Sequence, residues 1–185
     1  MKNYDRLKPL SIIVAVDEDG GYGKDGKIPW DIPLDRKHFQ EVTAGGICIM
    51  GRRTYEDMVQ MAEARVQVAK QKSKKKSKKR KRKAKKKTKS KATVPATKDT
   101  RILTGRDSFV LSRNPDFVAE GATVVHGIGE VTQEIDTSDK REVFILGGEH
   151  VFTAAFPTVY TVHMTVIPGR YDCNKKLYLP GITVI

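Results

Sequence analysis

The apolar run Leu10–Val16 (LSIIVAV) constrains the fold of this chain more than any other stretch. A strand with one face in water alternates apolar and polar residues, whereas this composition suits a strand that is buried on both faces. Two comparable runs, Ile47–Met50 and Glu142–Leu146, are each followed by glycine and a helical pattern. Strands separated by helices predict a three-layer α/β/α fold with a mostly parallel mixed central sheet.

Further elements continue this alternation. The expected helices are Pro33 to about Val42, Arg52 to about Arg65, the end of a weak helix at Thr132–Asp136, and Glu149–Phe156. The other expected strands are Arg106–Ser112, Ala122–Val125 and Val159–Val166, and Asp17–Lys27 is expected to be a glycine-bearing loop. At 185 residues, a single domain is the first expectation.

The net charge of +13 is concentrated in one segment. Sixteen Lys and Arg residues lie in Lys70–Lys91, called the basic tract below, and no acid occurs between Glu63 and Asp99. With Arg65 and Lys98, 18 of the 35 basic residues belong to this region, which leaves 17 against all 22 acidic residues, a net charge of −5. The sequence therefore predicts a mildly acidic domain, interrupted at about residues 63–100 by a low-complexity, disordered insert. The net positive charge therefore gives little support to functions that need a basic surface over the whole domain.

Cysteine content and hydropathy indicate a reducing, aqueous compartment. Two cysteines, Cys48 and Cys173, are too few for a disulfide framework, and no signal-peptide-like apolar stretch follows Met1. No apolar run approaches the roughly 20 residues that a membrane-spanning helix needs. We therefore expect a cytoplasmic protein without membrane contact. The run Lys78–Lys83 (KKRKRK) resembles a nuclear-localisation patch, which leaves a nuclear location open.

The stretch Ile28–Asp35 (IPWDIPLD) holds the only tryptophan of the chain and two prolines. Pro33 suits the first turn of a helix, where its missing N–H costs nothing. Steps of four and seven residues from Asp35 lead to Phe39 and Val42, which share one helix face with it. Asp35 is therefore either an ordinary first-turn acid, favoured by the helix dipole, or a functional carboxylate that faces the core side.

Two strand-to-helix junctions carry glycine, Met50-Gly51-Arg52 and Leu146-Gly147-Gly148. Free N–H groups and partial positive charge at a helix start favour a phosphate, and glycine lets a phosphate approach the backbone. Arg52, Arg53 and Arg113 add positive charge. The two junctions indicate a dinucleotide in a crevice above the sheet. Because neither junction has the G-x-G-x-x-G pattern, plain connections without a ligand are the alternative.

Other catalytic chemistries find no support in the sequence. The chain has no Ser/His/Asp motif and no Cys-x-x-Cys pair. Its four histidines have no metal-ligand spacing, so no metal site is expected. His38 and His163 are expected on helix or strand faces without a catalytic role.

Taken in chain order, these motifs resemble those of dihydrofolate reductase over roughly residues 10–60 and 101–180. Pro29-Trp30, followed by Pro33 and Asp35, matches the family's P-W-x-x-P-x-D signature. Further family motifs match Ser11–Val16 (SIIVAV), Ile49–Tyr55 (IMGRRTY), Leu103–Arg106 (LTGR), Leu111–Arg113 (LSR) and Ile145–Gly148 (ILGG). Gly20–Lys27 resembles the family's mobile loop beside the active site.

The resemblance implies reduction of 7,8-dihydrofolate to 5,6,7,8-tetrahydrofolate, with NADPH as cofactor and hydride transfer between two oriented rings. The catalytic residues that it implies are Asp35 and Trp30. The implied substrate-binding residues are Ile13, Ala15, Asp35, Phe39, Met58, Leu103 and Arg106. The implied cofactor-binding residues are Ala15, Gly23, Arg52, Arg53, Thr54, Ser112, Arg113, Gly147, Gly148, His150, Val151 and Phe152.

The resemblance also implies a role for individual side chains. Asp35 would grip the adjacent N–H donors of the pterin and favour protonation at N5, through a water that Trp30 holds. Arg106 would pair with the α-carboxylate of the glutamate tail. The arginines that would bind the cofactor phosphates favour NADPH over NADH.

The chain departs from the family pattern on its last strands. Val162 aligns with a threonine that is hydrogen-bonded to the catalytic acid, with Thr161 one residue before it, and a slip of one residue reverses the face. Phe152 stands where a tyrosine is common. The family continues past the position of Asp172 with a strand hairpin, of which this chain has few residues, so an open sheet edge is expected.

The basic tract is the largest departure, because 44 residues separate Met58 from Leu103 where the family has a handful. It is either a solvated loop, tolerated because loop-closure entropy grows slowly with length, or a contact for nucleic acid or another polyanion. The alternative function is therefore a catalytically weakened reductase-fold protein whose insert binds a polyanion or an assembly partner.

Overall fold

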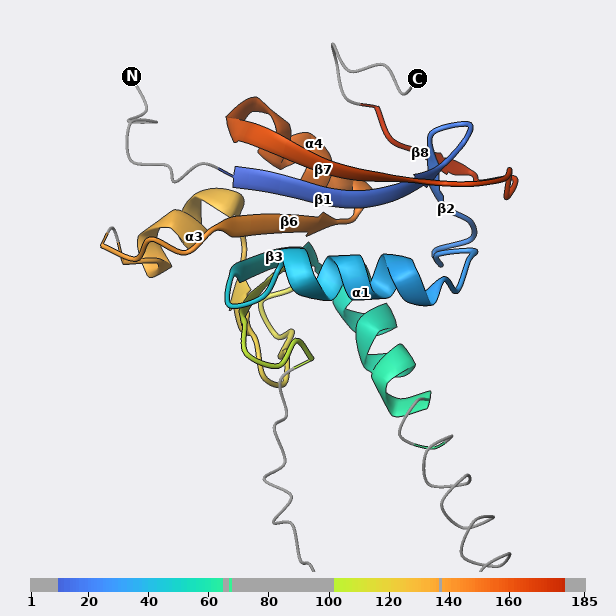
Figure 1. The fold of residues 1–185 in the computed structure, drawn as a ribbon. Coiled ribbons are helices and arrows are strands. Elements are labelled where there is room, and N and C mark those ends of the chain that lie inside the picture. The colour runs from blue at the N-terminus through green and yellow to red at the C-terminus, as the bar shows by residue number, and fades with distance from the viewer. Residues whose placement is uncertain (1–9, 65–66, 68–101, 137, 179–185) are drawn as a thin grey trace, which may run out of the picture.

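Six strands form one central sheet: β1 (Leu10–Asp17), β3 (Ile47–Gly51), β4 (Asp107–Leu111), β5 (Thr123–Val125), β6 (Val143–Gly147) and β7 (Val159–Ile167). The molecule is a computed structural model, which describes residues 10–64, 67, 102–136 and 138–178 (Figure 1). The strand order is β5-β4-β3-β6-β1-β7, and every pairing in this sheet is parallel. A separate antiparallel pair joins β2 (Gly21–Gly23) to β8 (Lys175–Lys176).

Helices cover both faces of the sheet, which confirms the three-layer α/β/α fold (Figure 1). On one face lie α1 (Pro33–Val42) and the helix of residues 52–64. On the other face lie α3 (Ile128–Glu134) and α4 (Glu149–Ala155), the latter followed by the 3-10 turn η2 (Phe156–Thr158).

Two hydrophobic clusters fill the spaces between these layers. The α1-side cluster buries Ile13, Cys48, Met50, Tyr55, Leu103, Val110, Ala119 and Phe144. The α4-side cluster includes Leu10, Ile12, Val14, Val16, Ile49, Val143, Ile145, Val151 and Phe152. Ile13 of β1 thus enters one cluster and Leu10, Ile12, Val14 and Val16 enter the other, which explains why β1 is apolar apart from Ser11 and Asp17. Each fully buried aliphatic side chain contributes about 1.5–3 kcal/mol relative to an exposed one.

The strands that follow β3 and β6 in the sequence lie on opposite sides of the β3–β6 pair in the sheet. From β3 the chain continues to β4 and β5, whereas from β6 it continues past β1 to β7. Such a reversal of strand order creates a crevice at the carboxyl ends of the strands, where α/β proteins bind ligands. Gly51 ends β3 and Gly147 ends β6, so both predicted glycine junctions lie at this crevice.

β7 is an outer strand of the sheet, and in the described part of the chain it pairs with β1 alone. Its Tyr160 is 79% exposed and its Val166 is 46% exposed. The described residues therefore leave the sheet edge open, as the sequence predicts. β7 carries no Lys, Glu or Pro of the kind that usually protects such an edge.

The loop expected at Asp17–Lys27 contains a short strand, β2, because β8 supplies its partner from the far end of the chain. The basic tract lies outside the described residues, so the organisation as one domain with a disordered insert stays a prediction. Within the described residues, the helices are too short or too polar to cross a membrane.

Candidate active site

Asp35 lies in the first turn of α1, on the half-buried face that also carries Phe39 and Val42. Burial raises the pKa of Asp35 above its ordinary value, and this effect exceeds the opposing effects of the His38 charge and the Trp30 N–H. An acid that served only the helix dipole would have a lowered pKa, because the dipole favours the charged form. Its surroundings therefore partly desolvate Asp35, and its role as a functional carboxylate stays a prediction.

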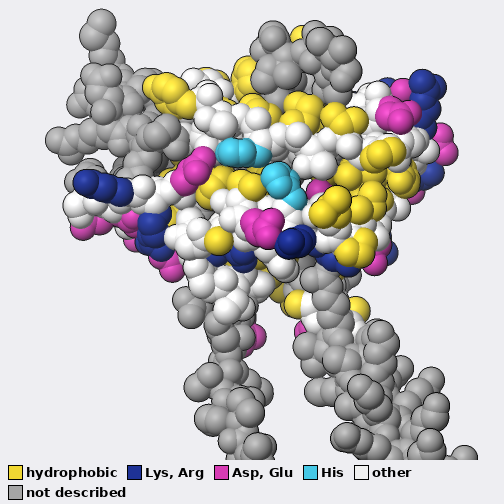
Figure 2. All heavy atoms as spheres, in the orientation of Figure 1, with side chains coloured by type: hydrophobic (Ala, Val, Ile, Leu, Met, Phe, Trp, Pro, Cys, Tyr) yellow, Lys and Arg dark blue, Asp and Glu magenta, His cyan; other side chains and the backbone are white. Residues whose placement is uncertain are grey.

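Trp30 lies beside this carboxylate and is 9% exposed. Its Nε1 is buried and makes no hydrogen bond of normal geometry within the described residues, although its interaction with Asp35 lowers the pKa of that carboxyl. A buried N–H without a partner costs roughly 1–3 kcal/mol, so such a group normally meets water or a ligand. The pair is suited to hold a water between the indole and the carboxylate. Figure 2 shows hydrophobic side chains gathered around the start of α1, where Ile28 and Leu34 are exposed.

The α1-side cluster unites most of the predicted substrate-binding residues. Ile13 and Leu103 are buried in it, and Phe39 and Met58 are partly buried against it. Ala15 is half-buried and lies two residues beyond Ile13 on β1, hence on the same face of the sheet. These five residues form an apolar wall on the α1 side of the sheet, and their role in substrate binding stays a prediction.

Arg106 is 9% exposed and is held against the end of α1. Its Nε donates to the Thr43 carbonyl at 2.9 Å and its Nη2 to the Gln40 carbonyl at 2.9 Å. The guanidinium also lies over the Phe39 ring, 5.9 Å from its centroid. These contacts fix the orientation of Arg106 beside the apolar wall and leave Nη1 without a hydrogen bond among the described residues.

The two glycine junctions form one surface. Met50 of β3 pairs with Gly147 of β6. A Cβ placed on Gly51 would lie 3.2 Å from Val151 Cγ2 and 3.6 Å from the Gly148 nitrogen. A Cβ on Gly148 would lie 3.6 Å from Thr54 Oγ1. Glycine at these positions therefore lets the two junctions pack closely together, and Gly51 and Gly148 remain partly exposed whereas Gly147 is buried.

Phe152 lies under the second junction, and a residue that the sequence analysis missed lies against it. A Cβ on Gly147 would meet the Phe152 ring at 3.1 Å. The ring of Tyr22 contacts Phe152 edge to face, with centroids 5.8 Å apart. Burial and the Glu149 charge raise the pKa of Tyr22 to about 12, so its hydroxyl is protonated at neutral pH. Gly23 follows Tyr22 on β2, and His150 is exposed beside Val151 on α4.

The remaining predicted cofactor residues continue this surface onto the next strand. Leu111 of β4 pairs with Gly51, so Ser112 and Arg113 follow directly at the same end of the sheet. Ser112 is buried, and its carbonyl lies 2.8 Å from His126 Nδ1. Arg53 and Arg113 are exposed. Arg52 pairs with Glu56 at 3.6 Å and lies over the Phe117 ring.

The register of β7 decides which of its residues face α1. Ile13 pairs with His163 and Ser11 pairs with Thr161, so Thr161 and His163 lie on the α1 face. Val162, which aligns with the family's threonine, packs instead against the α4-side cluster. Among the described residues, Asp35 has no hydrogen bond to β7.

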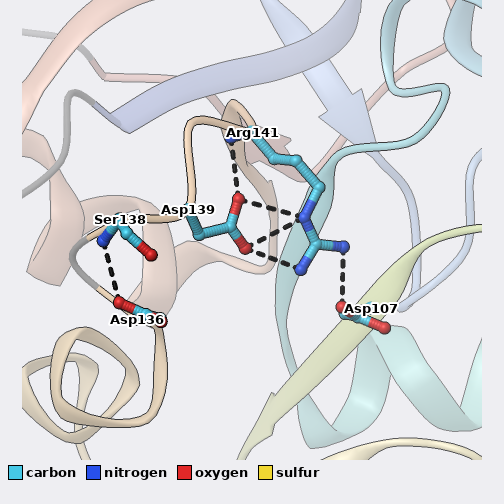
Figure 3. Close-up of polar contacts among 5 residues, drawn as sticks. All are labelled: Asp107, Asp136, Ser138, Asp139 and Arg141. Atoms are coloured by element: carbon cyan, nitrogen blue, oxygen red, sulfur yellow. Dashed lines mark hydrogen bonds and ion pairs between the residues drawn. The ribbon is translucent and has the colours of Figure 1, made fainter.

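A cavity of about 630 Å³ lies away from this crevice, at the opposite ends of the strands. Asp107, Ser108 and Thr123 line it at the start of β4 and β5, and of the predicted site residues only Arg106 reaches it. Figure 3 shows how Arg141 joins two of its acids: Nη1 lies 2.7 Å from Asp107 Oδ2, and Nη2 lies 2.7 Å from Asp139 Oδ2. The two carboxylates raise the pKa of Arg141. This network ties the 136–141 loop to β4 and is far from the predicted catalytic residues.

Comparison with known proteins gives a consistent result. A family model described as dihydrofolate reductase matches residues 9–99 and 97–183. Dihydrofolate reductase type 3 of Salmonella typhimurium is 28% identical over 163 residues, 88% of this chain and 74% of that protein. Dihydrofolate reductase of Bacillus subtilis (strain 168) is 26% identical over 166 residues, 90% of this chain and 73% of that protein.

The fold has a solved counterpart as well. A structure of dihydrofolate reductase from Enterococcus faecalis, complexed with NADP(H) and RAB-propyl, superimposes with a TM-score of 0.61. The two sequences are 28% identical, and the match covers 94% of this chain and 78% of that one.

Proposed function

The chain belongs to the dihydrofolate reductase family, and from this premise we propose that it reduces 7,8-dihydrofolate to 5,6,7,8-tetrahydrofolate with NADPH. The observation that carries the proposal is the pairing of Asp35, a carboxylate with a raised pKa, with the unpartnered indole N–H of Trp30. Asp35 shares its helix face with Phe39, which packs in the apolar wall with Ile13 and Met58. The family match gives no support to the alternative of a catalytically weakened protein.

The glycine surface suits a dinucleotide, because the partly exposed backbone of Gly51 and Gly148 lies at the switch point of the sheet. Gly147, Gly148 and Thr54 would hold its phosphates, and Arg52, Arg53, Ser112 and Arg113 would bind the remaining phosphate oxygens. Ala15, Gly23, His150, Val151 and Phe152 would line the rest of the site. When bound there, NADPH supplies a hydride from C4 of its nicotinamide ring.

The substrate ring would lie between the apolar wall and Asp35. The two carboxylate oxygens of Asp35 match two adjacent N–H donors of a pterin. Ile13, Ala15, Phe39, Met58 and Leu103 would exclude water from its faces. Arg106, already oriented by α1, would pair with a carboxylate of the glutamate tail.

The proton needed at N5 would come by way of Asp35. A pKa that burial raises makes the carboxyl a better proton donor near neutral pH. Trp30 Nε1 would hold the water that relays this proton. The chain therefore supplies orientation, exclusion of water and one proton path.

A spectrophotometric assay of the full chain tests this proposal. We expect NADPH absorbance to fall only when dihydrofolate is present. With NADH the rate should be lower by about 10-fold or more, because NADH lacks the extra phosphate that the arginines would bind. Asp116→Asn, which changes an exposed carboxylate, is the matched control for Asp35→Asn. A chain that binds both ligands but does not consume NADPH would contradict the proposal.

A further inference from the structure

We propose that the open edge of β7 (Val159–Ile167) binds the same edge of a second copy of this chain. The two β7 strands would run antiparallel, so that the two central sheets join across a twofold axis at His163. β7 lies at the outside of the sheet, beyond β1 (Figure 1). None of the roles assigned above uses this edge, and the association is independent of the proposed reductase activity.

The edge of β7 is accessible along its length. In the described part of the chain β7 pairs with β1 alone, so its other edge offers backbone N–H and C=O groups to a further strand. Of its nine residues only Ile167 is buried, and the two exposed large apolar side chains are Tyr160 and Val166. A second strand on this edge would cover part of both side chains.

The sequence of β7, VYTVHMTVI, is self-complementary about its middle residue. A twofold interface requires this property, because when residue i meets residue j of the second copy, j also meets i. With His163 on the axis, the cross-strand pairs are Val159 with Ile167, Tyr160 with Val166, Thr161 with Thr165, Val162 with Met164, and His163 with itself. Every pair thus joins side chains of one kind. Aromatic residues with β-branched ones, and threonine with threonine, are among the pairs that stabilise antiparallel strands.

This register also keeps the layers of the two copies on corresponding sides. Paired residues are both odd or both even in number, so they lie on the same face of the sheet in each copy. Thr161 and His163 lie on the α1 face, and Val162 lies on the α4 face. A slip of one residue would set Val162 against Thr165, and it would join the α1 face of one copy to the α4 face of the other.

The charges of β7 permit this pairing. The strand contains no Lys, Arg, Asp or Glu, so imidazole opposite imidazole at the axis is the only pair of ionisable groups in it. Glu142 Oε1 lies 3.6 Å from His163 Nε2, so each imidazole at the axis has an acid beside it. A strongly charged partner would find no opposite charge on β7 itself, whereas a second copy matches the strand at every position.

Two double variants test the register through charge. Tyr160→Lys/Val166→Lys places like charges opposite each other at both Tyr160–Val166 pairs, whereas Tyr160→Lys/Val166→Glu places opposite charges there. Both variants change only exposed side chains. Val118→Lys/Tyr178→Lys is the matched control, because it adds the same two charges outside β7, at apolar side chains that are 83% and 86% exposed.

The measurement is sedimentation equilibrium of the full chain over a wide range of concentration, with circular dichroism to check that each variant is folded. The net charge of +13 opposes association, so the salt concentration is kept at about 0.15 M, where the screening length is about 8 Å. We expect a monomer–dimer equilibrium whose dissociation constant rises about 10-fold or more in Tyr160→Lys/Val166→Lys. Tyr160→Lys/Val166→Glu and the control should stay within about threefold of the wild type.

Each contrary result would overturn a defined part of the proposal. A chain that stays monomeric at every concentration would exclude the dimer, including the case in which residues 179–185 cover the edge of their own chain. A dimer that survives Tyr160→Lys/Val166→Lys would place the interface elsewhere, and equal weakening in the control would reduce the effect to net charge. Association that Tyr160→Lys/Val166→Glu fails to restore would contradict the register about His163.

Discussion

Trp30 and Tyr171 meet edge to face, with ring centroids 5.2 Å apart and planes at 64°. The indole belongs to the segment before α1, whereas Tyr171 follows the last strand of the central sheet. The backbone N–H of Tyr171 donates to Asp17, at the end of β1. The position of the only tryptophan therefore depends on segments that lie far from it in the sequence.

Tyr171→Ala should loosen Trp30, because aromatic pairs contribute about 0.5–1.5 kcal/mol beyond their buried area. Tyr171→Phe is the matched control, since it removes only a hydroxyl that donates to the Pro168 carbonyl at 3.3 Å. Fluorescence reports on the indole alone, as Trp30 is the single tryptophan. We expect a red shift of emission in Tyr171→Ala and none in Tyr171→Phe; equal spectra for both variants would contradict the contact.

Asp35→Asn should lower turnover by about 100-fold or more, because the amide cannot pass on a proton. It should also raise the melting temperature at neutral pH. Since the folded state raises the pKa of Asp35, the charged form opposes folding once the pH exceeds that pKa, and the amide removes this charge. Thermal unfolding at neutral pH and below the ordinary carboxyl pKa checks this sign. Glu41→Gln, on the same helix, is the control, and a loss of stability in Asp35→Asn at neutral pH would be the contrary result.

Arg106→Lys should weaken the proposed contact with the glutamate tail. A hydrogen bond to a charged group contributes about 1.5–3 kcal/mol, so KM for dihydrofolate should rise about 10- to 100-fold with a smaller change in kcat. A pterin substrate without the glutamate should show no such rise. An equal rise for both substrates would indicate that Arg106 acts only through the Thr43 and Gln40 carbonyls of α1.

Cys173 should react faster with thiol reagents in Asp17→Asn than in the wild type. Burial raises the pKa of this thiol, and the hydrogen bond and charge of Asp17 raise it further. Removing that charge lowers the pKa and so increases the thiolate present at a given pH. Cys48 does not interfere, because it is fully buried and its pKa is raised to about 12. Alkylation followed by mass spectrometry measures the reaction rate of Cys173. An unchanged rate in Asp17→Asn would show that Asp17 does not raise the pKa of this thiol.

Deletion of residues 66–98 should leave turnover within about twofold, because loop length changes closure entropy only slowly. The same deletion should abolish retention of the chain on DNA at low salt, since counterion release by the 16 charges of the basic tract drives such binding. Retention that persists after the deletion would place the polyanion contact elsewhere.

Much of the fold could be predicted from local patterns. The bounds of α1, Pro33–Val42, are those expected from Pro33 and the Asp35, Phe39 and Val42 spacing. β1 and β6 were predictable because strands that are buried on both faces are largely apolar.

The parts that escaped prediction depend on contacts between distant residues. Asp17 and Tyr171 are 154 positions apart, and neither residue belongs to a repeating pattern. β2 and β8 are only three and two residues long, and each forms because the other supplies its partner. The side chain of Val162 faces away from α1 because the β1–β7 register shifts between Leu10 and Ser11. Leu10 pairs with Val159, whereas Ser11 pairs with Thr161. Such a shift changes which alternate residues face α1, and no local pattern in β7 reports it.

Isotope transfer tests the central claim most directly. The full chain is given dihydrofolate and NADPH in which both hydrogens at C4 of the nicotinamide are deuterium, and the folate product is analysed by mass spectrometry. The account predicts tetrahydrofolate with one deuterium at C6 of the pterin, formed at a rate that Asp35→Asn lowers by about 100-fold or more. Tetrahydrofolate without deuterium, or no product from a chain that binds both ligands, would contradict it.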